Sequence, residues 1–392
     1  MNTQLMRLLD RWLGFLPDYA LTLLIKLFQG RPSPSRKGPI VLVKLFGAGS
    51  IVLMAQVLQK FDVEPRDIYL VTFKSNATAA GLVGFRNIVF IRRTNVIDLV
   101  YDYLKALLRV VSLKPRATID FEFYSRTTSI FTKLVSLLTG AHSVGFWDAD
   151  YPRAQGYSSH MPFSYATHVT NLYEAGFAST ALERKLLPEI TTGRRRDVVR
   201  PLVLVNANAS DLALGRKWPE RNFVDLIVRL TQRFPNVEIG LTGEARESWT
   251  TAQILERVQQ LVPQALVEDY AGKWDFTTFW DKLQSCLLLV TNDSGPVHFA
   301  SYLGVSSVSL WGPGSPHQFG PLDKETHVTL WSAFPCSPCM YVRDREHGGF
   351  CGQTFPCMPA IPVDSVYSAC IEVIERELRT LTLSGSRELP HS

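Results

Sequence analysis

Residues 288–314 read LLVTNDSGPVHFASYLGVSSVSLWGPG, and this stretch carries the pattern that decides the fold. An apolar run enters the polar turn Thr-Asn-Asp-Ser-Gly at residues 291–295, and a helix is expected to begin near Pro296. A second β-rich run, residues 305–311, closes the unit before Gly-Pro-Gly. Strand, turn, helix and strand in this order predict a βαβ unit of a parallel sheet.

The polar turn is a candidate anion site. Asp293, Ser294 and Gly295 lie where the first amides of a helix and the positive end of its dipole can hold a phosphate. Ser294 or Asp293 is also expected to cap the helix, and a cap in an ordinary parallel sheet is the alternative interpretation. His298, farther along the helix, either closes on a phosphate or donor sugar or packs against a neighbouring loop.

The same alternation of strands and helices extends over most of the chain. Strands are expected at residues 40–45, 68–72, 88–91, 117–121, 143–146, 202–206, 237–242, 266–269, 287–290 and 305–310. Helices are expected at residues 98–111, 127–138, 222–233, 247–261, 276–282, 296–303 and 363–381. This pattern predicts an α/β fold with two Rossmann-like domains, each built on a parallel sheet, and a ligand cleft between them.

The composition supports two domains. A chain of 392 residues with 46% apolar residues can bury two cores. We expect a leader and linker over 1–37, a first domain over 38–195, a second over 196–362, and a C-terminal helix and tail over 363–392. The net charge of +5 fits anionic partners but is too small to indicate nucleic acid, and no nucleic-acid-binding motif is present.

The first thirty residues are apolar but interrupted by charges, among them Asp10, Asp18 and Lys26. The uncharged runs are far below the ~20 residues that span a membrane, and no secretory cleavage site follows them. An N-terminal amphipathic helical segment is therefore expected. It lies either on a membrane surface or on the core of the protein itself.

Small and cationic residues follow the first strand of the second half. Ser210 ends the run Asn-Ala-Asn-Ala-Ser, and Arg216 and Lys217 come shortly after it. Small residues allow a ligand to approach the backbone closely, while Arg and Lys suit a pyrophosphate. Because carboxyl ends of parallel strands share one edge, these residues are expected beside the turn at 291–295.

The next strand ends in Gly-Leu-Thr242-Gly243-Glu244. A carboxylate at this edge can accept hydrogen bonds from ribose hydroxyls, as in other nucleotide-binding folds. Glu247 is the competing candidate for this role. For either residue, the alternative is an acid that stabilises a helix N-terminus.

Together these segments resemble glycosyltransferase family 9, the lipopolysaccharide heptosyltransferase family. The matching segments are DSGPVHFASYLGV (293–305), WGP (311–313), KWPERNF (217–223), VKLFGAGSIV (43–52), IDFEFYSRTTS (119–129) and LLDRWLG (8–14). The resemblance implies the GT-B arrangement of two domains. It also implies an inverting, metal-independent transfer, without a cofactor, from a nucleotide-diphosphate sugar to a lipid-linked or cell-envelope glycan. Such an enzyme is expected in the cytoplasm, on the inner face of the plasma membrane.

The resemblance also assigns roles to the candidate residues. Ser210 and Lys217 are expected to bind the donor diphosphate, and Glu244 the ribose. Asp293 is expected to meet hydroxyls of the donor sugar, and the amides that follow it to meet the phosphates. Charge that grows on the leaving phosphate would then be stabilised by a fixed helix terminus and a lysine.

One departure from the family concerns the general base. The family carries an aspartate directly after the glycine of the first-domain turn, whereas Gly49 is followed here by Ser50. A serine hydroxyl is not a base near neutral pH without an activator, so Ser50 is expected to contact acceptor or phosphate. Asp120, and after it Glu122, end a strand and are the candidates for the base; strand-end acids facing water are the alternative.

The missing base leaves other functions open. The chain can transfer sugar to a soluble small molecule instead of a lipid-linked glycan. It can also be a nucleotide-sugar-binding protein without catalysis.

Six cysteines follow residue 285. Cys286 lies in an expected strand and is predicted to be core, while Cys336, Cys339, Cys351 and Cys357 can form a four-thiolate zinc site, disulfides, or remain free thiols.

Overall fold

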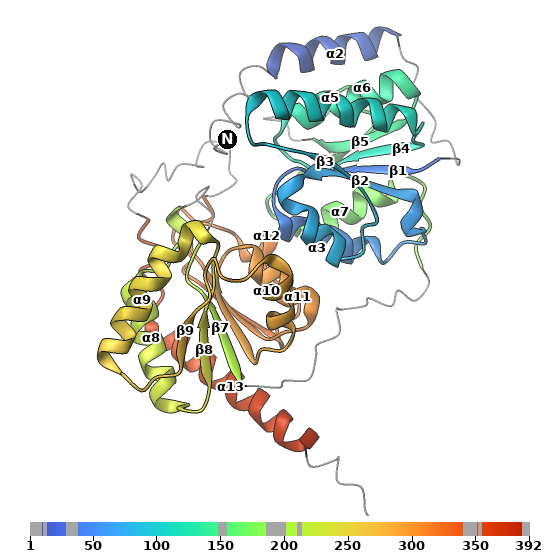
Figure 1. Ribbon diagram of the computed structural model, residues 1–392. Coiled ribbons are helices and arrows are strands. Elements are labelled where there is room, and N and C mark those ends of the chain that lie inside the picture. Colours follow the sequence, from blue (N-terminus) through green and yellow to red (C-terminus); the bar gives the residue numbers. More distant parts are fainter. Residues whose placement is uncertain are drawn as a thin grey trace, which may run out of the picture. The chain divides into compact units, whose positions relative to one another are not determined.

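The computed structural model describes residues 10, 14–28, 38–147, 155–185, 201–209, 214–339, 351 and 355–385. The chain divides into two compact units, Met1–Thr191 and Thr192–Ser392. Each unit is a six-stranded sheet with helices on both faces (Figure 1). The predicted α/β class with two Rossmann-like domains is therefore confirmed.

Unit 1 contains the first parallel sheet. Its strands are β1 (Ile40–Val43), β2 (Ile68–Phe73), β3 (Asn87–Ile91), β4 (Ala117–Asp120), β5 (His142–Trp147) and β6 (Ser159–Pro162). Its helices are α2 (Phe15–Phe28), α3 (Ala48–Leu58), α4 (Ala77–Leu82), α5 (Val96–Ser112), α6 (Arg126–Thr139) and α7 (Val169–Ala178), with short 3-10 turns η1 (Pro65–Asp67) and η2 (Lys74–Asn76). The sheet order is β3-β2-β1-β4-β5-β6, and every neighbouring pair is parallel.

Unit 2 repeats this plan. Its strands are β7 (Leu202–Asn206), β8 (Glu238–Leu241), β9 (Val267–Asp269), β10 (Leu288–Asn292), β11 (Ser307–Trp311) and β12 (His327–Trp331). Its helices are α8 (Glu220–Arg233), α9 (Ser248–Leu261), α10 (Phe276–Gln284), α11 (Gly295–Leu303), α12 (Pro316–Phe319) and α13 (Val363–Gly385), with η3 (Leu214–Arg216) and η4 (Ala245–Glu247). The order β12-β11-β10-β7-β8-β9 is again fully parallel.

In both units the strand order reverses beside the first strand. The reversal lies between β1 and β4 in unit 1 and between β7 and β10 in unit 2. At such a switch point the two flanking connections run to opposite faces of the sheet, which leaves room for a ligand at the carboxyl edge. The predicted site residues follow these strands, so the topology brings them together within each unit.

The apolar runs form strands because both faces of each sheet are covered. Ile40–Val43 is buried along its whole length, as expected for a central parallel strand. In unit 2, Phe223 and Leu226 of α8, Val258 of α9 and Val373 of α13 join one buried cluster against the sheet. The C-terminal helix α13 thus belongs to the core of unit 2.

Two strands were not predicted. β6 is half-exposed and reads Ser-His-Met-Pro, which lacks an apolar run, because it lies at the edge of the sheet. β12, also an edge strand, mixes polar and apolar residues. The remaining strands and the seven predicted helices occur within a few residues of their expected bounds.

The described part of the leader is Asp10, Gly14 and the helix α2. This helix packs against α6 through a buried polar contact, in which Lys133 Nζ lies 2.7 Å from Asp18 Oδ1. Ser129 Oγ donates to the same oxygen at 2.7 Å. Of the two alternatives from the sequence, packing on the protein is observed for α2, and attachment to a membrane surface stays a prediction. Among the helices of the described residues, none has the length and apolar character needed to cross a bilayer.

Candidate functional site

The turn between β10 and α11 forms the centre of the unit 2 site. β10 is buried throughout, and α11 begins at Gly295 with Pro296 in its first turn, as predicted. Ser294 holds the cap position but does not cap with its side chain, because its hydroxyl instead lies 3.0 Å from Thr291 Oγ1. Ser294 therefore takes the predicted cap position, but among the described residues its side chain makes no cap hydrogen bond to the first amides of α11. A helix start of this kind favours an anion.

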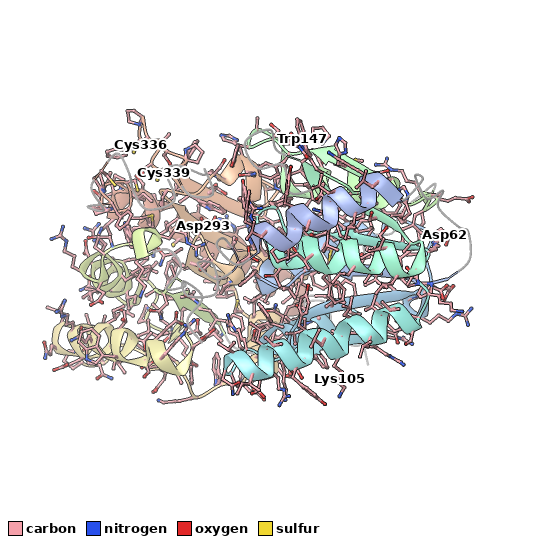
Figure 2. All side chains as sticks on the ribbon, turned by 90° about the horizontal axis from the view of Figure 1, so that it is seen from above. Asp62, Lys105, Trp147, Asp293, Cys336 and Cys339 are labelled. Carbon is pink, nitrogen blue, oxygen red and sulfur yellow. The ribbon has the colours of Figure 1, made fainter. Side chains whose placement is uncertain are left out.

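Asp293 is buried in the same turn, 5% exposed (labelled in Figure 2). Its Oδ1 lies 3.7 Å from Arg216 Nη1, while Oδ2 has no hydrogen-bond partner among the described residues. Burial raises the pKa of this carboxyl, and the Arg216 guanidinium opposes that shift. A buried acceptor without a partner is costly, so Oδ2 is suited to accept a hydroxyl of a ligand.

A glycine makes room for this carboxylate. A Cβ atom on Gly314 would lie 2.1 Å from Asp293 Oδ2, closer than any real contact. Position 314 therefore requires a glycine, because the Asp293 side chain occupies the space where a Cβ atom would lie.

Asn292 connects the loops around the site. Its Oδ1 accepts from the amide of Trp218 at 3.1 Å, and its Nδ2 donates to the carbonyls of Ala207 at 3.0 Å and Asn208 at 3.3 Å. Because one buried amide binds both the loop after β7 and the loop before α8, it fixes both against the β10 turn. The sequence pattern alone did not single out Asn292, although the residue follows an apolar run at a strand end.

The predicted cations take different positions. Arg216, at the end of η3, is buried and directed to Asp293, so in this structure it supports the carboxylate instead of facing an open diphosphate position. Lys217 is half-buried and lines a pocket of about 400 Å³ together with Trp218 and Thr250. The ring of Trp218 is buried, and its Nε1 donates to the carbonyl of Ile361 at 3.0 Å, which anchors Lys217 beside the pocket.

The loop after β7 contributes a buried amide. Asn208 is 1% exposed, and neither Oδ1 nor Nδ2 has a hydrogen-bond partner among the described residues. A Cβ on Gly243 would lie 2.8 Å from Asn208 Nδ2, so the loop after β8 passes directly beside this amide. Asn208 is thus a further candidate for ligand contact that the sequence analysis quoted but did not select. Ser210 lies outside the described residues.

The end of β8 carries the predicted ribose ligands. Thr242 is buried, and its amide donates to the carbonyl of Val205 at 2.9 Å. Glu244 is exposed, and its carboxylate is 2.8 Å from Arg246 Nε. Glu247 Oε2 accepts from the Glu244 amide at 2.8 Å, which completes a capping box, and burial raises the pKa of Glu247. In the same capping box the Glu244 side chain accepts from the amide of Glu247. The helix-terminal alternative is therefore observed for both acids, and ribose binding by Glu244 stays a prediction.

His298 lies on α11 four residues after Ser294 and is buried. Its position in the first turns of α11 places it near the predicted anion site. Contact of His298 with a phosphate or a donor sugar stays a prediction.

The corresponding edge of unit 1 begins with the glycine turn after β1. Gly47 has a φ of 83°, in the region that favours glycine, and precedes α3. Ser50 lies in the first turn of α3 and is half-buried, with its hydroxyl within 3.2 Å of the position that a Cβ on Gly47 would occupy.

Glu122 holds this turn in place. Its Oε1 accepts from the amides of Leu45 at 2.8 Å and Phe46 at 2.7 Å, and its Oε2 is 3.0 Å from Lys44 Nζ. Burial alone would lower the pKa of Lys44, but the charge and hydrogen bond of Glu122, together with the smaller effects of Tyr173 and Asp120, outweigh it, so the pKa is raised. Glu122 is only 7% exposed. It fixes the loop and does not face open space.

Asp120 is also buried, with 0% exposure. Its Oδ2 accepts from the Tyr157 hydroxyl at 2.8 Å, and its Oδ1 from the Glu122 amide at 3.0 Å. Asp120 and Glu122 are therefore buried and hydrogen-bonded and do not lie at an open edge. Their role as a base stays a prediction.

The six cysteines are unbridged among the described residues. Burial raises the pKa of the Cys357 thiol to about 11. Within the described part of the chain, no three His, Cys, Asp or Glu side chains converge as metal ligands. The structure shows Cys336, Cys339, Cys351 and Cys357 as free thiols without a disulfide, and the zinc interpretation stays a prediction. The core assignment of Cys286 is confirmed.

Comparison with known families now decides the membership. A family model described as glycosyltransferase family 9 (heptosyltransferase) matches residues 113–348, which is more than half of the chain. The chain belongs to glycosyltransferase family 9. The match to family 9 includes β4 and most of unit 2, with Lys217, Glu244 and Asp293, but not Ser50.

The curated relatives align with about a third of this chain. Lipooligosaccharide heptosyltransferase 2 of Haemophilus influenzae is 32% identical over 121 residues, 30% of this chain and 33% of that protein. Lipopolysaccharide heptosyltransferase 2 of Escherichia coli is 28% identical over 114 residues, 29% of this chain and 32% of that protein. The aligned stretches thus span about a third of these relatives.

Solved structures of the family share the fold over a greater length. ADP-heptose lipopolysaccharide heptosyltransferase II of Escherichia coli has a TM-score of 0.62 at 16% identity, covering 86% of this chain and 99% of that one. Heptosyltransferase WaaC of Escherichia coli, solved with ADP, has a TM-score of 0.58 at 16% identity, covering 74% of this chain and 92% of that one. These likenesses support the two-domain family 9 fold.

Proposed function

We propose that this family 9 protein transfers a sugar of the heptose class from a nucleoside-diphosphate sugar to a lipid-linked glycan acceptor of the lipopolysaccharide type. Relatives that align with it are named as lipopolysaccharide and lipooligosaccharide heptosyltransferases, and one solved structure holds ADP. The observation that carries the proposal is the β7–β10 switch point of unit 2. There the uncapped start of α11 and the unpartnered Oδ2 of Asp293 follow β10. Lys217 precedes Trp218, whose amide donates to Asn292 at the end of β10.

The chemistry follows from this arrangement. An acceptor hydroxyl oxygen attacks the anomeric carbon of the donor, the bond from that carbon to the β-phosphate oxygen breaks, and the hydroxyl proton passes to a base. Charge accumulates on the departing diphosphate, where the first amides of α11 and the Lys217 ammonium stabilise it without a metal ion. Attack opposite the leaving group inverts the anomeric configuration. Asp293 Oδ2 accepts from a hydroxyl of the donor sugar and orients the ring.

The remaining candidate residues take binding and positioning roles. Glu244 binds the ribose, and Asn208 completes the pocket wall beside Gly243. Ser50 contacts the acceptor hydroxyl or a phosphate, since its half-buried side chain begins α3. Asp120 and Glu122 position the loop that carries Ser50. We place the enzyme on the cytoplasmic side of the membrane, where its acceptor lipid would be presented.

A second candidate function is a nucleotide-sugar-binding protein without catalysis. Ser50 stands where the family carries its aspartate, and the two nearby carboxylates are buried. These observations favour a site that binds donor but lacks a base in unit 1.

A turnover assay with ADP-heptose and a delipidated glycan acceptor separates the two. Release of ADP that depends on the acceptor is expected from the native chain, and its absence despite tight ADP binding would contradict transfer. Ser50→Asp restores the acid of the family pattern. If the native chain only binds the donor, Ser50→Asp should gain turnover. If the native chain is an active enzyme, Ser50→Ala should raise the KM for the acceptor.

A further inference from the structure

The helix α2 has its polarity reversed relative to an ordinary surface helix. Its acid, Asp18, is buried against α6, and Thr22 beside it accepts from Lys133 Nζ at 2.8 Å; among the described side chains of this helix, Ile25 is the buried apolar one. The side chains on the opposite side are large and apolar, and they are exposed: Phe15, Leu16, Tyr19, Leu23, Leu24 and Leu27. The single charge on that side is Lys26. A surface helix of a soluble domain normally buries its apolar side and exposes its charges.

The helix α5 exposes a similar apolar stripe. The exposed side chains recur every three or four residues: Val96, Ile97, Val100, Tyr101, Leu104 and Leu108. Ile97 is 80% exposed and Leu108 is 71% exposed. Lys105 and Arg109 are exposed on the same helix, and Figure 2 shows Lys105 at the outer side of α5.

The carboxylates of these two helices are all engaged. Asp102 is buried and bonded to Arg92, with Arg92 Nε at 2.7 Å from its Oδ2. Asp98 accepts from Asn95 Nδ2 at 3.1 Å and lies 3.8 Å from Arg92 Nη2. With Asp18 also paired, the outward sides of α2 and α5 combine apolar side chains with cations and carry no unpaired carboxylate.

These two helices flank α6 on one face of the unit 1 sheet, as Figures 1 and 2 show. Among the described residues, eighteen large apolar side chains are exposed; six lie on α2, six on α5 and one, Leu138, on α6. The remaining ones are dispersed over both units. Exposed apolar side chains that gather in this way mark an interaction surface.

We propose that the outward sides of α2 and α5, here called the outer helical face, dock onto a lipid bilayer with anionic headgroups. Apolar side chains would enter the headgroup boundary, while Lys26, Lys105 and Arg109 meet lipid phosphates. A second copy of the chain fits less well, because a twofold contact of this face with itself would bring like charges together. The inference deepens the proposed function, since a lipid-linked acceptor is reached at such a surface.

Docking can be tested with the full chain and vesicles of known composition. Co-sedimentation is compared for vesicles of equal phosphatidylethanolamine and phosphatidylglycerol and for vesicles of neutral phosphatidylcholine. We expect binding to the anionic vesicles that weakens with salt. Leu104→Glu/Leu108→Glu and, separately, Leu23→Glu/Leu27→Glu should each lower the partition coefficient at least about tenfold.

A matched control places the same charges on unit 2. Trp249 and Leu261 of α9 are 69% and 64% exposed, so Trp249→Glu/Leu261→Glu changes comparable side chains outside the outer helical face. This variant should bind vesicles as the native chain does. Because all six substituted side chains are exposed, the variants should keep the native circular dichroism spectrum and bind ADP in unit 2 as before.

Three results would overturn docking: no sedimentation of the native chain with anionic vesicles, native binding by the α5 variant, or a native dimer that the α5 variant dissociates. The third would assign the face to a second copy. Failure of docking with intact ADP binding and sugar transfer leaves the proposed function standing. Vesicle binding without ADP binding would instead contradict the proposed function alone.

Discussion

The buried ion pair between Lys133 and Asp18 predicts how firmly α2 belongs to unit 1. Lys133 is 0% exposed, and its ammonium lies 2.7 Å from Asp18 Oδ1 and 2.8 Å from Thr22 Oγ1. Lys133→Met keeps the length of the side chain but leaves the Asp18 carboxylate buried. Its remaining cation, Arg126, is 3.9 Å away. Removing one partner of a buried ion pair costs about 3–5 kcal/mol of folding free energy. Because Arg126 still offers Asp18 a positive charge, we expect a loss of about 3 kcal/mol.

This loss is large against the ~5–15 kcal/mol that stabilise a typical domain. Urea unfolding gives the change in free energy, and amide hydrogen exchange in α2 and α6 localises it to unit 1. The matched control is Lys60→Met, because Lys60 Nζ is 2.8 Å from Glu174 Oε2 at a partly exposed site. That variant should lose at most about 1 kcal/mol.

A double variant separates charge from packing. Asp18→Asn/Lys133→Met removes both charges and keeps an oxygen that accepts from Ser129, so it should recover most of the stability lost in Lys133→Met. If the free energy of unfolding of Lys133→Met lies within about 1 kcal/mol of that of the native chain, the ion pair does not hold α2 on unit 1. A double variant as unstable as the single one would also refute the reasoning.

Three further predictions concern other parts of the molecule. Gly314→Ala places a methyl group against Asp293 Oδ2, so ADP-heptose affinity measured by calorimetry should fall by about tenfold or more while the fold is kept; unchanged affinity would contradict a role for that carboxylate. Burial lowers the pKa of His327 to about 4, against an ordinary 6.5, so the unfolded chain binds the proton first and the stability of unit 2 should fall as the pH drops from about 6.5 to about 4. In thermal melts across that range His327→Asn should reduce this slope, and an unchanged slope would assign it to other groups. Glu122→Gln leaves Lys44 buried without its counter-charge and should cost about 3 kcal/mol in chemical unfolding, with ADP binding in unit 2 unaffected.

Much of the fold could be predicted because parallel strands that are covered on both faces need continuous apolar runs. β1 and β10 are of this kind, and polar or glycine turns follow both. The edge strands β6 and β12 were missed because one side of each has no neighbouring strand, and their sequences need not be apolar.

The candidate site was only partly predictable. The Asp293 turn, Lys217 and the glycines follow strands, and parallel topology alone brings strand ends to one edge. The burial of Asp120 was not predictable, because it depends on Tyr157, thirty-seven residues away in the chain. The same holds for Asn292, whose partners lie on the loops after β7 and before α8.

The orientation of α2 shows another limit of sequence patterns. An amphipathic pattern identifies two sides of a helix but does not say which side faces the protein. In α2 that choice depends on Lys133, a buried charge on α6 that only the tertiary structure brings beside Asp18. The usual rule would have placed the leucines inside.

The central claim is that the β7–β10 switch point of unit 2 binds a nucleoside diphosphate. Calorimetric titration of ADP into the native chain, Lys217→Ala and Lys282→Ala tests it most directly, since Lys282 is an exposed lysine on α10 of the same unit. We predict binding by the native chain, an affinity at least about tenfold weaker for Lys217→Ala, and native affinity for Lys282→Ala. Absence of ADP binding by the native chain, or equal affinity in Lys217→Ala, would show that this switch point does not bind the diphosphate through Lys217.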